Sequence, residues 1–165
     1  QDYEVETQVV IQQPAQVVFD YIRFLGNQDN FSVWAAMDPN MQKSYRGVDG
    51  TVGFVSAWQS DNPDVGSGEQ EIKAIKEAER IDFELRFYQP FNAVSPAYML
   101  TEPVSEQQTR VRWGFTGNLP YPMNLMLLFV DVEGMIAADL QQGLDNLKLI
   151  MEAPATETES ALPVN

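Results

Sequence analysis

Apolar and polar side chains alternate along much of the chain before residue 118, and this pattern predicts a series of strands. In residues 80–89, Ile81 and Phe83 share one face, while Asp82 and Glu84 share the other. A period of two residues is typical of a strand with one buried face. The same criterion predicts seven strands, at residues 3–11, 41–46, 51–59, 67–76, 80–89, 93–104 and 107–117. Short turns join the last six strands, so we expect antiparallel pairing.

Two short helices are predicted after the first strand, and one long helix after the last. Pro14 opens the first helix, where its missing N–H removes no hydrogen bond, and Gly26 ends it. Residues 29–37 form the second helix. From residue 123 to residue 151, apolar side chains recur every three or four positions, as on one helix face. Gly134 and Gly143 weaken this helix, so we expect them to allow its close approach to the sheet.

These elements predict an α+β fold in which a seven-stranded curved antiparallel sheet carries two short helices and one long C-terminal helix. A helix of this length in a small domain buries its apolar face only on the concave side of the sheet. Pro96 predicts an edge or a bulge for its strand. We place a single domain at residues 1–152 and expect residues 153–165, which lack any period, to be a disordered tail.

Composition and charge exclude several kinds of function. The chain has 24 acidic and 10 basic residues, a net charge of −14, which argues against nucleic acid as a partner. Cysteine and histidine are absent, so Ser-His and Cys-His catalysis and the commonest zinc ligands are excluded. Any catalysis would use carboxylates, Tyr, Lys, Arg or water.

The acidic residues do not predict a metal site or a catalytic carboxylate pair. Strand alternation places Glu69 and Glu71 on the face opposite Gln70, which we expect to be the outer one. Asp131 and Glu133 do not share a helix face. We therefore expect a solvated outer face with cross-strand charge pairs, no metal and no cofactor.

Five short segments carry a family resemblance. They are VVIQQPAQVVFDYI at 9–22, GSGEQEI at 66–72, RIDFEL at 80–85, TRVRW at 109–113 and GLDNL at 143–147. With the order of elements, they make residues 3–151 similar to the SRPBCC superfamily, also called START-like or Bet v 1-like. Within it the chain resembles the polyketide cyclase/dehydrase-like branch. These motifs specify the fold well and the chemistry poorly.

The resemblance implies a helix-grip fold with a deep cavity between the sheet and the long helix. Members bind sterols, lipids, plant hormones, polyketides and other apolar molecules; a minority are cyclases or dehydratases, and others are chaperone-binding modules. Many relatives of this branch have an apolar anchor before the first strand. The chain begins at Gln1 rather than Met, which fits an anchor that was removed and any other trimming equally well. We expect a soluble domain, in a compartment that the sequence does not determine.

The predicted inner surface is rich in aromatic side chains, as ligand pockets are. Any one of these residues is better explained as ordinary core, whereas the set favours a cavity. The candidate cavity residues are Trp34, Phe54, Ser56, Trp58, Gln70, Phe83, Leu85, Phe87, Tyr98, Leu100, Trp113, Phe115, Met126, Phe129 and Val130.

Three functions are compatible with this surface. We favour a carrier or sensor that binds an apolar small molecule or lipid. The second is a cyclase or dehydratase, in which Tyr98 or Ser56 would be the catalytic group. The third is a protein-interaction module that uses the apolar stretch at residues 119–128. A homodimer is compatible with the sequence, which does not determine the oligomeric state.

Overall fold

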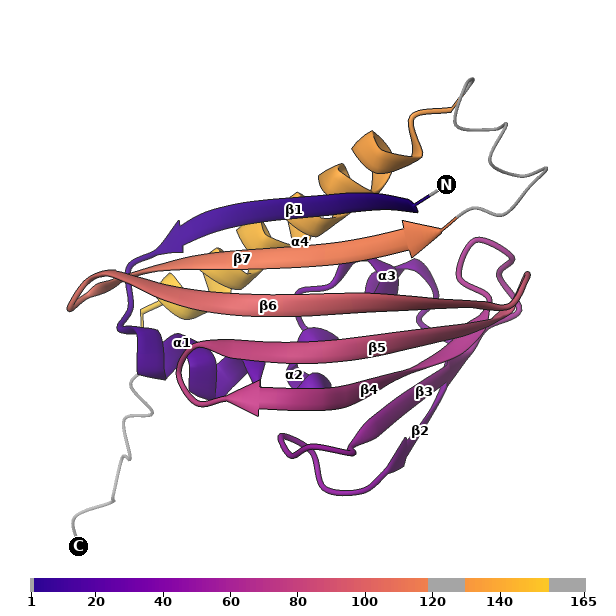
Figure 1. The fold of residues 1–165 in the computed structure, drawn as a ribbon, viewed down its shortest axis with the longest axis horizontal. Helices are drawn as coiled ribbons and strands as arrows, with labels where there is room; N and C mark the ends of the chain where they lie inside the picture. Colours follow the sequence, from indigo (N-terminus) through magenta and orange to yellow (C-terminus); the bar gives the residue numbers. More distant parts are fainter. Residues whose placement is uncertain (1, 119–129, 155–165) are drawn as a thin grey trace, which may run out of the picture.

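The computed structural model describes residues 2–118 and 130–154, and it contains one seven-stranded antiparallel sheet. The strands lie in the order β1-β7-β6-β5-β4-β3-β2, so only β1 and β7 are neighbours that are distant in sequence (Figure 1). Their bounds are β1 (Asp2–Ile11), β2 (Gln42–Arg46), β3 (Val55–Gln59), β4 (Ser67–Lys76), β5 (Arg80–Gln89), β6 (Ala93–Ser105) and β7 (Gln108–Asn118). The predicted α+β fold is confirmed.

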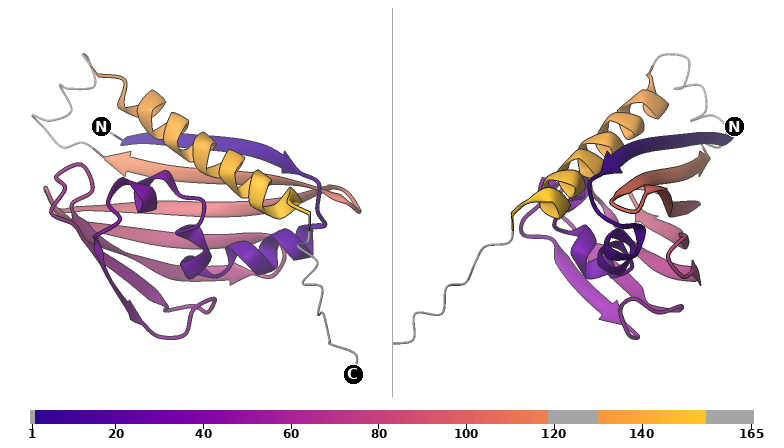
Figure 2. Two further views of the ribbon diagram at one scale, coloured as in Figure 1. Left: turned by 180° about the vertical axis from the view of Figure 1, so that it is seen from behind. Right: turned by 90° about the vertical axis from the view of Figure 1, so that its left-hand side faces the viewer.

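The helices lie together on one side of the sheet, as Figure 2 shows. They are α1 (Ala15–Ile22), α2 (Leu25–Gln28), α3 (Val33–Met37) and α4 (Val132–Glu152). The first predicted helix is therefore two helices, and the second begins at Val33 rather than at residue 29. The expected start of the long helix, at residue 123, falls outside the described residues. Within them the helix begins after Asp131, whose side chain accepts a hydrogen bond of 2.8 Å from the Gly134 amide.

Two strand predictions differ from the structure for reasons of backbone geometry. Gly50 and Gly53 have positive φ angles of 78° and 93°, so turns occupy the start of the strand predicted at 51–59 and β3 begins at Val55. Pro96 lies in an interior strand rather than at an edge. Its pairing with β5 is regular, but the β6–β7 ladder begins only at Ala97. Pro96 therefore stands beyond the part of β6 that has two neighbours, where its missing donor is tolerated.

The hydrophobic core fills one end of the space between the sheet and the helices. Val18, Phe19 and Ile22 of α1 are buried there, with Leu144 and Leu147 of α4. The sheet supplies side chains from the same face of four strands, namely Ile72, Ile81, Met99 and Val111. This end of the domain is solidly packed, so any open space must lie toward the other end.

Helix α4 packs closely on the sheet at Gly143. A Cβ atom there would lie 2.8 Å from Cζ3 of Trp113 and 3.5 Å from the Phe31 carbonyl oxygen. One turn later, Asn146 donates a hydrogen bond of 3.1 Å to the same carbonyl. The expectation of close approach holds for Gly143. At Gly134 the reason is different, because a Cβ there would collide with the Asp131 side chain that caps the helix.

Side chains of α4 also cover the free edge of β1. Lys148 Nζ donates to the Val10 carbonyl at 2.7 Å, and Gln141 Nε2 donates to the Gln8 carbonyl at 3.2 Å. An edge strand otherwise presents unpaired backbone groups to other chains. Two side chains of the last helix thus supply hydrogen-bond donors to two backbone carbonyls at the free edge of the first strand.

Filling the contact at Gly143 should destabilise the protein. We expect Gly143→Leu to lower the free energy of unfolding by about 1–3 kcal/mol, because overpacking outweighs the gain of about 1 kcal/mol in helix propensity. Urea denaturation at pH 7 measures the change. Ala138→Leu, on the exposed face of the same helix, should change it by less than about 0.5 kcal/mol. Equal effects of the two substitutions would contradict the role given to Gly143.

Candidate functional site

A pocket of about 380 Å³ lies between the inner face of the sheet, α3 and the first half of α4. All seven strands contribute to its wall, β2 through Lys43 alone, and Ile136 and Leu140 of α4 close it from the helix side. The chain has three tryptophans, Trp34, Trp58 and Trp113, and all of them line this pocket. The pocket therefore occupies the end of the domain opposite the packed core.

The structure brings many of the sequence-predicted side chains to this pocket and leaves others out. Those that line it are Trp34, Trp58, Gln70, Leu85, Phe87, Trp113 and Phe115. Phe54, Ser56 and Phe83 are buried but do not line it. Val130 is 39% exposed and does not line it either. Met126 and Phe129 fall outside the described residues.

Tyr98 and Leu100 lie on the outer face of the sheet, contrary to the prediction. The inner positions of β6 are Ala93, Ser95 and Ala97, which line the pocket. The prediction assigned the largest side chains of this strand to the inside, whereas small side chains face inward there. Their small size leaves room for the pocket.

Tyr98 has a structural role on that outer face. A Cβ at Gly114, its cross-strand partner, would collide with its ring, so the ring covers that glycine. Its hydroxyl donates a hydrogen bond to Glu6, and the Arg80 guanidinium lies 4.5 Å from the ring centroid. Burial and the hydrogen bond to Glu6 raise the pKa of Tyr98 to about 12. A protonated phenol on this face cannot act on a molecule in the pocket.

Aromatic rings form the side walls of the pocket. Trp113 makes edge-to-face contacts with Phe31, at a centroid distance of 5.7 Å, and with Trp34, at 6.4 Å. Trp58 meets Phe87 edge-on at 6.0 Å and also covers Gly68, where a Cβ would lie 2.8 Å from its ring. Such ring pairs are mutually stabilising. They hold the walls in place around the open volume.

Two buried polar side chains interrupt the apolar floor. Gln70 of β4 is 9% exposed and Ser95 of β6 is 3% exposed, and both line the pocket. Across the described parts of the chain, neither side chain makes a hydrogen bond to protein. Ser95 was missed by the sequence analysis, and the run of small residues at alternate positions of β6 is the signal that could have found it.

Charged side chains reach the pocket only at its rim. Asp64 is exposed there, and so is Asp29, whose carboxylate accepts a hydrogen bond of 3.0 Å from Lys43. In the described ranges, no three acidic side chains gather closely enough to hold a metal ion. No described helix combines the length and the apolar character needed to cross a bilayer.

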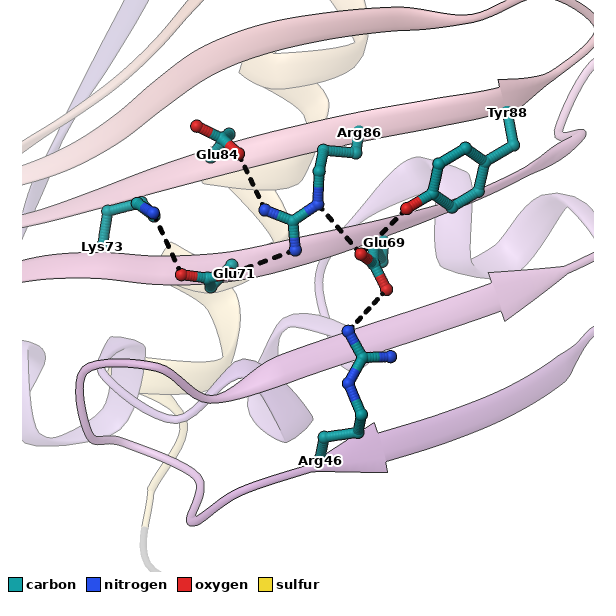
Figure 3. Close-up of polar contacts among 7 residues, drawn as sticks. All are labelled: Arg46, Glu69, Glu71, Lys73, Glu84, Arg86 and Tyr88. Carbon is teal, nitrogen blue, oxygen red and sulfur yellow. Dashed lines mark hydrogen bonds and ion pairs between the residues drawn. The ribbon is translucent and has the colours of Figure 1, made fainter.

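The outer face of the sheet carries the network of charges shown in Figure 3. Arg86 donates to Glu69 at 2.9 Å, to Glu71 at 3.1 Å and to Glu84 at 2.7 Å. Arg46 and Tyr88 each donate to Glu69 at 2.9 Å. Burial alone would raise the pKa of Glu69, but these three donors outweigh it and hold the pKa below its ordinary value. The charges are paired with one another, as expected for a structural face.

Residues 2–152 match the family described as polyketide cyclase / dehydrase and lipid transport, and the chain belongs to this family. The match spans the sheet and all four described helices. The predicted membership of the SRPBCC superfamily is confirmed. No curated protein sequence matches the chain.

Solved structures with the same fold include an enzyme, a protein of undescribed role and a dimer. Norcoclaurine synthase from Thalictrum flavum, in complex with dopamine and hydroxybenzaldehyde, has a TM-score of 0.68 at 10% identity, over 91% of this chain and 86% of its own. A protein from Nitrosospira multiformis has a TM-score of 0.62 at 17% identity, over 92% of this chain and 97% of its own. The Aha1 dimer from Colwellia psychrerythraea has a TM-score of 0.59 at 12% identity, over 91% of this chain and 96% of its own. At these identities the likeness shows the fold alone.

Acid should destabilise the protein partly through Glu69. A carboxyl whose pKa is lowered by folding stabilises the fold above its unfolded pKa of about 4.3, and this contribution is lost as the pH falls through the folded pKa. We expect Glu69→Gln to lower the free energy of unfolding by about 1–2 kcal/mol at pH 7. Urea denaturation between pH 7 and pH 3 should also show a shallower acid dependence in the variant.

The control for this experiment is Glu79→Gln, which removes an exposed pair with Lys76. Its effect should be below about 0.5 kcal/mol at pH 7, because solvent screens such pairs. An unchanged acid dependence in Glu69→Gln would show that the pairing of this carboxylate does not contribute to folding.

Proposed function

We propose that the chain binds an apolar small molecule or lipid in the pocket between the sheet, α3 and α4, and acts as its carrier or sensor. The observation that carries this proposal is the pocket of about 380 Å³, whose floor and walls are mostly apolar and aromatic. Its size lies within the range of small-molecule sites, about 300–1,000 Å³. A family that includes lipid transport supports the same function.

The walls are suited to hold an apolar molecule without first rearranging. Trp113 is held by edge-on contacts with Phe31 and Trp34 and by the close approach of Gly143 of α4. Fixed aromatic walls lose little conformational freedom when a ligand binds, so more of the interaction energy appears as affinity. Apolar area removed from water contributes about 25 cal/mol per Å² before such costs.

Catalysis is less well supported than binding. Of the two side chains considered as catalytic groups, Tyr98 lies on the outer face and Ser56 is buried beside the pocket without lining it. A serine hydroxyl also needs a base, and the chain has no histidine. Neither of the two groups considered for the cyclase or dehydratase alternative therefore supports it.

The remaining predictions about partners stay open. The apolar stretch considered for protein interaction, residues 119–128, falls outside the described residues. Aha1 is a dimer in its own structure, and a homodimer of this chain stays a prediction. A membrane tether ahead of Gln1 also stays a prediction.

The neutral apolar dye N-phenyl-1-naphthylamine should bind in this pocket. Because all three tryptophans line it, binding should quench tryptophan emission and raise dye emission by energy transfer. Ala93→Phe, which places a ring in the pocket, should weaken binding at least about tenfold. Titration followed by fluorescence measures the dissociation constant. Native mass spectrometry of the purified protein should reveal a retained apolar molecule.

Val94→Phe is the matched control, because Val94 is the next residue of β6 and is 60% exposed on the outer face. It should change the dissociation constant by less than about twofold. Absence of energy transfer in the unsubstituted protein, or equal weakening by both substitutions, would refute binding in this pocket. Circular dichroism verifies that both variants are folded.

A further inference from the structure

A row of polar side chains crosses the inner face of the sheet. Strand register places Ser56 opposite Gln70, Gln70 opposite Leu85 and Leu85 opposite Ser95. Directly opposed side chains on one face are close neighbours, with Cβ atoms about 5 Å apart. Gln70 and Ser95 thus stand on either side of Leu85. Their Cα atoms are about two strand spacings, or 10 Å, apart across the sheet. Both line the pocket.

These two side chains are largely buried, at 9% exposed for Gln70 and 3% for Ser95, and both line the pocket. Among the described residues, neither makes a side-chain hydrogen bond to the protein. The one fully buried side-chain atom without a partner in the described part of the chain is Thr7 Oγ1, so the polar atoms of Gln70 and Ser95 stay accessible from the pocket. Because a polar group removed from water needs a new partner, a ligand that displaces water here must offer one.

The floor around them carries no charge. The carboxylates of Glu69 and Glu71, which flank Gln70 in β4, point to the outer face and are bonded to Arg86. At the rim, Lys43 is already paired with Asp29. An ionised group on the floor would therefore find no counter-ion among the described residues, and burying an uncompensated charge is strongly unfavourable. The excess of acidic residues in the chain further opposes an anion.

We propose that the pocket selects neutral amphipathic molecules, whose hydroxyl, carbonyl or amide group bonds to Gln70 or to Ser95. The apolar part of such a molecule lies against Trp34 and Trp113. This inference rests on the proposed function and narrows its ligand class. Ionised fatty acids are excluded, because their carboxylate would be desolvated without a counter-ion. Both polar side chains carry donor and acceptor atoms, so they match any of the three neutral groups.

The test compares two ten-carbon molecules that differ in the head group. Decan-1-ol and decanoate, which is ionised at pH 7, each compete with bound N-phenyl-1-naphthylamine in the full chain. We expect decan-1-ol to displace the dye with a dissociation constant at least about tenfold lower than that of decanoate. Equal or tighter binding of decanoate would overturn the selection of neutral molecules.

Two substitutions locate the head group. Gln70→Met keeps the length of the side chain and removes its hydrogen bonds, and Ser95→Ala removes the hydroxyl. At least one of the two substitutions should weaken decan-1-ol about 3- to 10-fold, and both should leave the affinity for the dye within about twofold. Gln59→Met, at an exposed position of β3 that does not line this pocket, is the control and should change neither affinity.

The outcomes separate the inference from the function on which it rests. Binding of the dye together with unchanged decan-1-ol affinity in both variants overturns the polar head-group site and leaves apolar binding intact. Failure of the dye to bind the unsubstituted protein overturns both. Loss of dye binding along with alcohol binding in Gln70→Met, with the fold retained, would mean that Gln70 shapes the pocket and does not select a head group.

Discussion

The contact between Trp113 and Gly143 is the constraint on which the architecture depends. A Cβ on Gly143 of α4 would press on the Trp113 ring of β7, and this ring also meets Phe31 and Trp34 edge-on. One side chain of the sheet thereby contacts α4, α3 and the segment before α3. A larger residue at position 143 would lift the helix, and a smaller one at position 113 would leave all three elements without a common support.

This contact also divides the inner face of the sheet into two regions. On the α1 side, branched and long side chains such as Ile72, Ile81 and Met99 fill the space completely. On the other side, Ala93, Ser95 and Ala97 stop short of the helices, and the pocket begins. The same sheet holds both regions, and the size of its inner side chains differs between core and open volume. The same strand, β6, contributes to each.

The sequence predicted the fold largely through strands that alternate clearly. The bounds of β4 and β5 agree with the expected ranges, because charges occupy the outer positions of both strands and β5 carries Ile81, Phe83 and Leu85 at inner positions. Strand β6 was misread in register, since Tyr98 is large but lies over Gly114, and Ser95 is polar but faces inward. Beside a pocket, small side chains of a strand face inward and large ones face outward, which is the reverse of a packed core. The neighbouring strands determine which face lies inward, and the sequence of one strand does not show them.

The pairing of β1 has a consequence for the order in which the protein can assemble during synthesis. β1 leaves the ribosome first, yet its partner strand follows about a hundred residues later, with Val10 opposite Arg110. The α4 side chains that cover its other edge come later still. Until then β1 is an unpaired alternating strand, and the acidic side chains of Asp2, Glu4 and Glu6 along one face disfavour its pairing with another copy. The acidic side chains of β1, which face solvent in the folded protein, thus disfavour association of the nascent chain before β7 and α4 are synthesised.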